Sequence, residues 1–126
     1  MISSTENIDQ ILGQNPVFNG STMAFDLGVT SLPKVDRLMH FLTQWRSEDR
    51  IADMLLLLSH PPSLAVGARE LNQDDLLKPM TFFENSEIKL YKNLRGGGLT
   101  YHWDGQLVCY PILKLQSHEQ NISNYM

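Results

Sequence analysis

Three consecutive glycines stand beside side chains that could bind a substrate. Residues 95–102 are, in order, Arg95, Gly96, Gly97, Gly98, Leu99, Thr100, Tyr101 and His102. Adjacent glycines give up side-chain packing, so they are informative where the backbone needs positive φ or lies close to another group. Successive backbone N–H groups in such a turn form an anion-binding nest, and Arg95 adds positive charge. The pattern predicts a site for an acyl carbonyl, carboxylate or phosphate; the alternative is a mobile hairpin connection, against which the flanking polar side chains argue.

Two histidines are candidate site residues. His102 follows Thr100 by two positions, so both side chains lie on the same face of an extended chain, and we expect His102 to belong to the site. His60 precedes two prolines, which force an extended backbone next to it. For His60 the sequence is equally compatible with a structural role and with a ligand-facing one.

The single cysteine and the acidic residues give no sign of metal chemistry. Cys109 lies in an apolar run, which favours a buried thiol that packs as a small hydrophobe. Asp74 and Asp75 are typical of a helix cap, and no HExxH, CxxC or EF-hand spacing is present. We therefore expect neither a metal nor another cofactor.

Composition narrows the partners and the compartment. The 126 residues fit one domain, with residues 1–20 predicted as a mobile lead-in and residues 21–126 as the folded part. The net charge of −4 gives no basic surface for nucleic acid. The N-terminus lacks the features of a secretory signal, and the longest apolar run, residues 54–58, is too short to span a bilayer. We expect a protein of the cytoplasm with no membrane partner, and the mitochondrion and the plastid stay open.

Alternating and helical patterns of apolar residues place the glycines between strands. Strands are predicted at residues 23–27, 54–58, 63–66, 88–90 and 107–113, and the second of these is expected to be buried on both faces. A helix capped by Thr30 or Ser31 has Pro33 in its first turn and an apolar stripe that consists of Val35, Leu38, Met39, Leu42 and Trp45.

The remaining segments give weaker signals. A brief helix is predicted to begin at Asp74 and to be broken by Pro79, with Phe82 and Phe83 packed beneath the fold. Residues 117–126 are polar, and residues 121–125 resemble the beginning of a helix.

Several motifs together resemble the lipoyl(octanoyl) transferase family, also called lipoate-protein ligase B. They are LLLLSHPP at residues 55–62, Gly67, RGGGLTYH at residues 95–102, GQLV at residues 105–108 and YPIL at residues 110–113. Their order and spacing match over about residues 20–126, which makes the resemblance more specific than any single motif.

The resemblance implies an α/β (α+β) fold like that of biotin- and lipoate-protein ligases, a mixed sheet with flanking helices. It also implies an acyltransferase of lipoate biosynthesis that moves octanoyl from octanoyl-acyl carrier protein to a lysine of lipoyl domains. The acceptors would be lipoyl domains of 2-oxoacid dehydrogenases and the glycine cleavage H protein. In that family the segment that matches residues 95–102 lines the acyl pocket, and His60, Gly67, Trp103, Asp104 and Gly105 are expected at its edge.

The sequence also departs from the family pattern. Trp103 and Asp104 replace the family's Gly-Pro, and Ser59 replaces its usual Glu. The family's nucleophilic cysteine and activating lysine match a region beyond residue 126, so no catalytic residue is assigned to this chain, and Cys109 does not match that cysteine. We expect a domain truncated at its C-terminus, with an unpaired strand edge and an uncovered apolar face. Such a chain is inactive alone or is completed by a separate chain.

Two other functions fit the sequence. The lack of an assigned nucleophile is compatible with a non-catalytic module that holds an octanoyl or lipoyl group. The glycine-rich loop is also compatible with an ATP-dependent lipoate or biotin ligase, although residues 105–111 fit the transferase better.

Overall fold

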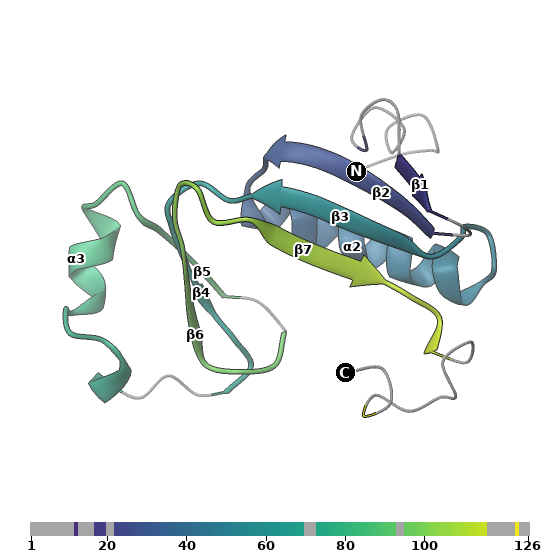
Figure 1. Ribbon diagram of the computed structural model, residues 1–126. Coiled ribbons are helices and arrows are strands. Elements are labelled where there is room, and N and C mark those ends of the chain that lie inside the picture. Colours follow the sequence, from purple (N-terminus) through teal and green to yellow (C-terminus); the bar gives the residue numbers. More distant parts are fainter. Residues whose placement is uncertain are drawn as a thin grey trace.

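The computed structural model describes residues 12, 17–19, 22–69, 73–92, 95–115 and 123, and these form two sheets with helices beside them (Figure 1). The large sheet has the order β1-β2-β3-β7, from strands β1 (Val17–Asn19), β2 (Thr22–Val29), β3 (Met54–Ser59) and β7 (Val108–Ile112). Only β2 and β3 are parallel in it. Helix α2 (Leu32–Ser47) makes the crossover that a parallel pair requires.

The small sheet carries the glycines. Its order is β5-β4-β6, from strands β4 (Ser63–Val66), β5 (Lys89–Lys92) and β6 (Leu99–His102). Between the parallel strands β4 and β5 the chain forms a 3-10 helix (Gln73–Asp75) and the short helix α3 (Met80–Glu84). The mixed α/β class predicted from the sequence is therefore confirmed.

The main core lies between α2 and one face of the large sheet. Pro33 occupies the first turn of α2, as predicted, and Ser31 is the N-cap residue, without a side-chain capping bond. Burial follows the predicted helical stripe, because Val35, Leu38 and Leu42 are buried, with Met39 and Trp45 packed at the edge. The buried cluster consists of Leu12, Phe25, Val35, Leu38, Leu42, Met54, Leu56, Leu58 and Ile112.

The second predicted strand is not buried on both faces. In β3, Met54, Leu56 and Leu58 are fully buried, whereas the residues between them are half-exposed. Helix α2 covers only one face of the large sheet (Figure 1), so the apolar run is continuous in sequence but not in burial. Within the described residues β7 pairs only with β3.

The prediction of a helix that begins at Asp74 is wrong. Residues 73–75 form a single 3-10 turn, and the α-helix begins after Pro79, which is its N-cap. Proline has a fixed φ and no N–H, so it fits the entrance of a helix better than its interior. Phe82 is half-exposed rather than packed beneath the fold, and its ring meets that of Phe83 edge to face.

Several boundaries differ from those predicted. Residues 17–19, in the predicted lead-in, form β1, and β6 lies within the segment expected to be a loop. The predicted start of a helix at residues 121–125 lies outside the described residues except for Ser123.

Asp53 joins three elements at one end of the large sheet. Its Oδ1 accepts hydrogen bonds from Nε of Arg46 in α2 at 2.5 Å and from the backbone N–H of Lys114 after β7 at 3.1 Å. Its backbone carbonyl accepts from the N–H of Met23 in β2 at 3.1 Å. The Asp53 and Arg46 side chains are both largely buried, so this pair is more than a surface ion pair.

We expect Asp53→Ala to lower the free energy of unfolding by about 1–3 kcal/mol, because it leaves two part-buried donors without this acceptor. Urea unfolding measures the change. Glu48→Ala is the control, since Glu48 forms an exposed pair with Arg50 and should leave the urea midpoint nearly unchanged. Equal midpoints for the two variants would contradict the structural role of Asp53.

The glycine loop, residues 95–98, is fixed to the turn that follows β4. The N–H of Gly67 donates to the carbonyl of Gly98 at 2.6 Å, and that of Arg69 donates to Gly97 at 3.1 Å. The N–H of Ala68 donates to the carbonyl of Arg95 at 2.8 Å. A Cβ on Gly67 would clash with the carbonyl oxygen of Gly97, so glycine at position 67 is needed for this approach.

Gly67→Ala should cost about 1–3 kcal/mol of stability, because the new methyl group pushes two backbones apart. Gly96→Ala is the matched control, since a Cβ there has nothing within 4 Å. Thermal unfolding of both variants measures the difference. If the two variants melt at the same temperature, the loop is not held closely on the turn.

Candidate functional site

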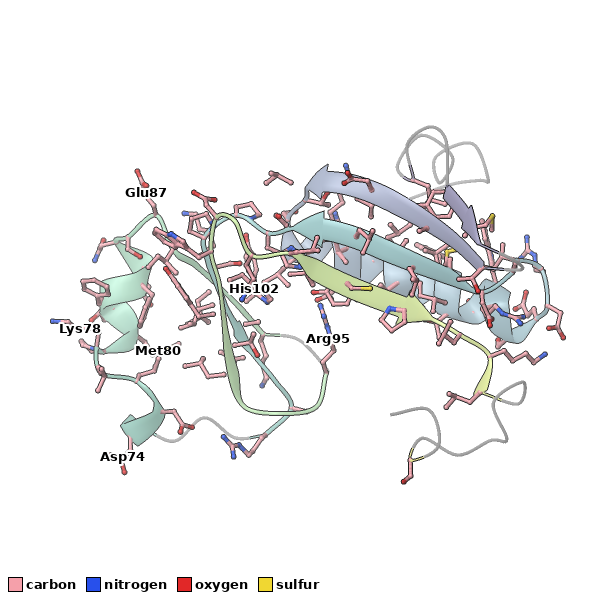
Figure 2. The ribbon with its side chains drawn as sticks, in the orientation of Figure 1. Asp74, Lys78, Met80, Glu87, Arg95 and His102 are labelled. Atoms are coloured by element: carbon pink, nitrogen blue, oxygen red, sulfur yellow. The ribbon has the colours of Figure 1, made fainter. Side chains whose placement is uncertain are left out.

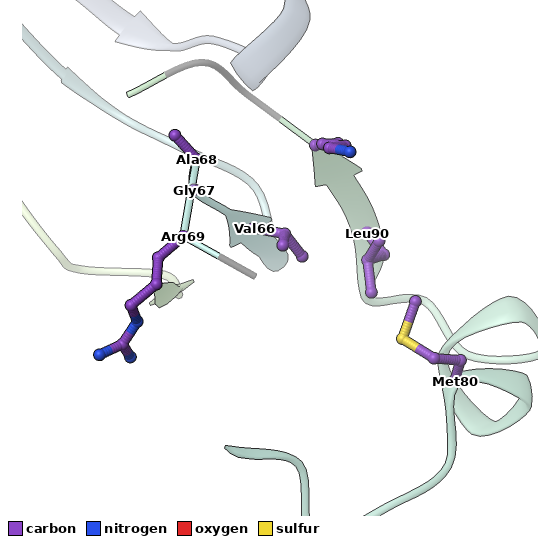
Figure 3. A pocket seen from close by; sticks show the side chains of 7 residues that line it. Val66, Gly67, Ala68, Arg69, Met80 and Leu90 are labelled. Atoms are coloured by element: carbon purple, nitrogen blue, oxygen red, sulfur yellow. The ribbon is translucent and has the colours of Figure 1, made fainter. Parts of the chain in front are cut away.

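A pocket of about 410 Å³ opens on the small sheet beside α3 (Figure 3). Its lining is mainly apolar, with two cations, and consists of Val66, Gly67, Ala68, Arg69, Met80, Leu90 and Lys92. Val66 and Lys92 are paired in register, and Leu90 lies two residues from Lys92, so these side chains share one face of the sheet. A volume of this size is in the range of small-molecule sites.

The glycine loop lies behind one wall of this pocket. Gly67 and Arg69 line the pocket and also hold the loop by hydrogen bonds to its carbonyl groups. Gly97 has φ of 89°, as expected for one of the three glycines. Because the carbonyl groups of the loop face the turn, they are not available as acceptors for a ligand on that side.

His60 is enclosed where the two sheets meet. Its side chain is 1% exposed, and its Nδ1 lies 2.6 Å from the carbonyl oxygen of Thr30. Its Nε2 lies 2.8 Å from the hydroxyl of Tyr110 in β7. Burial lowers the pKa of His60, although the hydrogen bond with Thr30 opposes this, so the ring is neutral at neutral pH. Of the two interpretations left open by the sequence, the geometry shows a fully bonded buried histidine.

His102 lies against His60. The two rings meet edge to face with their centroids 4.7 Å apart, and Nδ1 of His102 lies 2.8 Å from Oε1 of Gln106. His102 is buried, whereas Thr100, on the same face of β6, is exposed.

Arg95 is held between α2 and β7. Its guanidinium forms an ion pair with Asp36 at 2.5 Å, and its Cζ lies 4.5 Å from the centroid of the Tyr110 ring. Burial lowers the pKa of Arg95, but the interactions with Tyr110 and with Asp36 raise it, and the net shift is upward. Arg95 therefore remains a fixed cation at the start of the glycine loop (Figure 2).

The residues that replace the family's Gly-Pro lie on the surface. The rings of Tyr101 and Trp103 stack with centroids 5.6 Å apart, and both are nearly half-exposed. Register places Tyr101 on the face of the small sheet that carries Leu64 and Leu90, which is the pocket face. Asp104 is exposed, and Gly105 turns the chain with φ of 82°.

The prediction of a buried Cys109 is wrong. Cys109 lies in β7 but is exposed, because it points to the face of the large sheet opposite α2. Its neighbours Val108 and Tyr110 point to the covered face instead. The apolar run was a poor guide because only alternate residues of the strand are covered.

Sequence reasoning missed Asp36 and Tyr110 as partners of Arg95, and Arg69, Met80, Leu90 and Lys92 as pocket residues. Apart from the tyrosine within the YPIL motif, no local signal distinguishes them. In the described part of the chain, no group of three His, Cys, Asp or Glu residues could hold a metal ion. No helix among the described residues is long and apolar enough to cross a membrane.

Comparison with known proteins gives consistent results. The family model described as the lipoyl protein ligase A/B catalytic domain matches residues 36–126. An octanoyltransferase of Desulforamulus reducens is 40% identical over 64% of this chain and 35% of its own length. The octanoyltransferase of Roseiflexus sp. is 41% identical over 64% of this chain and 33% of its own length. The octanoyltransferase of Corynebacterium jeikeium is 38% identical over 79% of this chain and 40% of its own length.

The chain thus spans between about a third and two fifths of the length of these curated relatives. Among solved structures, protein Ta0514 of T. acidophilum aligns with a TM-score of 0.48 and 21% identity over 75% of this chain and 37% of that chain. That likeness is too low to inform the site. The family model, by contrast, matches well over half of the chain, which therefore belongs to the lipoyl protein ligase A/B catalytic domain family.

Proposed function

We propose that this chain is the part of a cytoplasmic octanoyltransferase that binds the acyl donor. The whole reaction moves octanoyl from octanoyl-acyl carrier protein to a lysine of a lipoyl domain, the first step in making protein-bound lipoate. The observation that supports this most directly is the glycine loop fixed against the wall of an apolar pocket. The relatives named octanoyltransferase supply the reaction class.

The pocket suits the octanoyl tail. Val66, Met80 and Leu90 provide apolar walls, and each methylene removed from water contributes about 0.8 kcal/mol. Two cations, Arg69 and Lys92, also line the pocket and would interact with a polar head group.

The thioester carbonyl is assigned to residues 95–102, with Gly67, Trp103, Asp104 and Gly105 around the edge. His60 is buried and is not among the residues that line the pocket. Backbone N–H groups of the glycine loop would stabilise the oxygen as negative charge develops on it. A fixed loop orients the donor in advance, which lowers the entropic part of the barrier. The contribution of this chain is then binding and orientation, and no nucleophile is assigned within it.

Leu90→Ser should weaken binding of octanoyl-pantetheine at least tenfold, because it places a hydroxyl group against the acyl tail. Isothermal titration calorimetry of the purified chain measures the affinity. Lys89→Ser is the control, since Lys89 precedes Leu90 and lies on the opposite face of β5. Equal affinities of the two variants, both folded, would remove the pocket from the proposal.

A transfer assay tests the assignment of chemistry. Octanoyl-carrier protein, an apo lipoyl domain and this chain are mixed without nucleotide, and the lipoyl domain is weighed by intact mass spectrometry. We expect this chain to bind the carrier protein only when the carrier protein bears octanoyl, and we expect the lipoyl domain to gain no mass. A mass gain that is lost in Cys109→Ser would instead locate a nucleophile at Cys109.

The same samples distinguish the other functions. Pyrophosphate release that depends on ATP and lipoate would replace the transferase by a ligase. Binding of free octanoate or of a lipoylated domain in preference to the octanoyl thioester would favour a non-catalytic module. Failure to bind any octanoyl compound would contradict the proposal altogether.

A further inference from the structure

One buried imidazole is linked to both ends of the glycine segment, directly at one end and through Tyr110 at the other. His60 stacks edge to face on His102, the last residue of the segment, at 4.7 Å. Through the Tyr110 hydroxyl it also reaches Arg95, the first residue, whose guanidinium lies over the Tyr110 ring. No sequence pattern links His60 to Tyr110, which stands 50 residues later.

The hydrogen bonds of His60 have a fixed direction. The Thr30 carbonyl can only accept, so Nδ1 of His60 carries the proton and donates it. In the neutral ring Nε2 is then an acceptor, and the Tyr110 hydroxyl donates to it. This bond fixes the Tyr110 ring, and the guanidinium of Arg95 lies over that ring with its Cζ 4.5 Å from the centroid.

The fixed position of the Arg95 side chain also restricts the backbone of the glycine loop. Its guanidinium lies between Tyr110 and the carboxylate of Asp36, so its side chain is held from two elements. Its carbonyl accepts the N–H of Ala68, in the turn that lines the pocket. A shift of the Arg95 side chain would therefore strain the loop at the point where it meets the pocket wall.

We propose that His60 and Tyr110 are positioning residues that set the orientation of Arg95 and thereby the conformation of the glycine loop at the acyl-donor site. This inference rests on the proposed function for its ligand but not for its geometry. Neither residue needs to touch the acyl group, because both act through Arg95. The charged and titratable groups around His60 are His102, Arg95 and Asp36.

The test removes one oxygen atom. Tyr110→Phe keeps the ring over Arg95 and deletes the hydroxyl, and we expect the affinity for octanoyl-pantetheine to fall at least fivefold. In the ligand-free protein, the backbone amide signals of Gly96, Gly97 and Gly98 should move in nuclear magnetic resonance spectra. Tyr91→Phe is the matched control, because Tyr91 lies in β5 outside the pocket and outside this hydrogen-bond chain.

A double-variant cycle shows whether the effect passes through Arg95. Arg95→Gln should weaken binding, and adding Tyr110→Phe should weaken it no further, because the ring that the hydroxyl anchors to His60 then has no cation to orient. Losses that multiply in the double variant would overturn the proposal. His60→Gln should resemble Tyr110→Phe in the glycine signals, while a change in melting temperature without a change in those signals would show a merely structural role.

The two proposals fail separately. If the unmodified chain binds no octanoyl-pantetheine, the proposed function fails, and the glycine signals of Tyr110→Phe still decide the positioning role. If the chain binds the probe but Tyr110→Phe leaves both affinity and glycine signals unchanged, the positioning role is wrong and the proposed function stands.

Discussion

The two sheets of this chain are joined around a buried histidine that must satisfy both of its ring nitrogens. His60 follows the last strand residue of β3 and leads through two prolines into β4, so its position determines how one sheet enters the other. An imidazole with almost no exposure cannot exchange its partners for water without a large penalty. Thr30 and Tyr110 are therefore held at fixed places on either side of β3, and the small sheet is placed relative to both.

A second constraint is the contact between Gly67 and the glycine loop. The turn at residues 67–69 donates three backbone hydrogen bonds to the loop and at the same time forms a wall of the pocket. The pocket wall and the loop are consequently coupled, since a displacement of one would move the other. In an acyl-binding site this coupling matters, because the tail and the carbonyl of one ligand must be held at a fixed separation.

Sequence patterns predicted the helices and strands better than the burial and long-range contacts of their residues. The stripe of α2 and the strands β2, β3, β4, β5 and β7 follow from local periodicity, since helix and strand formation depend on near neighbours. Strands β1 and β6 were not predicted, because they lie in the expected lead-in and in the expected glycine loop. The exposure of Cys109 and of one face of β3 could not be predicted in this way, because exposure depends on which face of the sheet α2 covers. Tyr110 and Asp36 were missed for a related reason: they meet Arg95 only through the fold, and Asp36 is 59 residues away from it.

The proposed function assigns binding, and not chemistry, to the described pocket. A nucleophile must lie within reach of the acyl carbonyl, and the single cysteine, Cys109, points away from α2 and is absent from the pocket lining. The groups that do surround the pocket are apolar side chains, two cations and backbone amides. In the proposed function these groups hold and orient an acyl thioester without forming a bond to it. Orientation of the reactants alone can lower a reaction barrier by a large amount, so a domain can be specialised for orienting a substrate. The cross-sheet contacts of His60 and the close approach at Gly67 are understandable in these terms, because both restrict the motion of the loop that would receive the carbonyl.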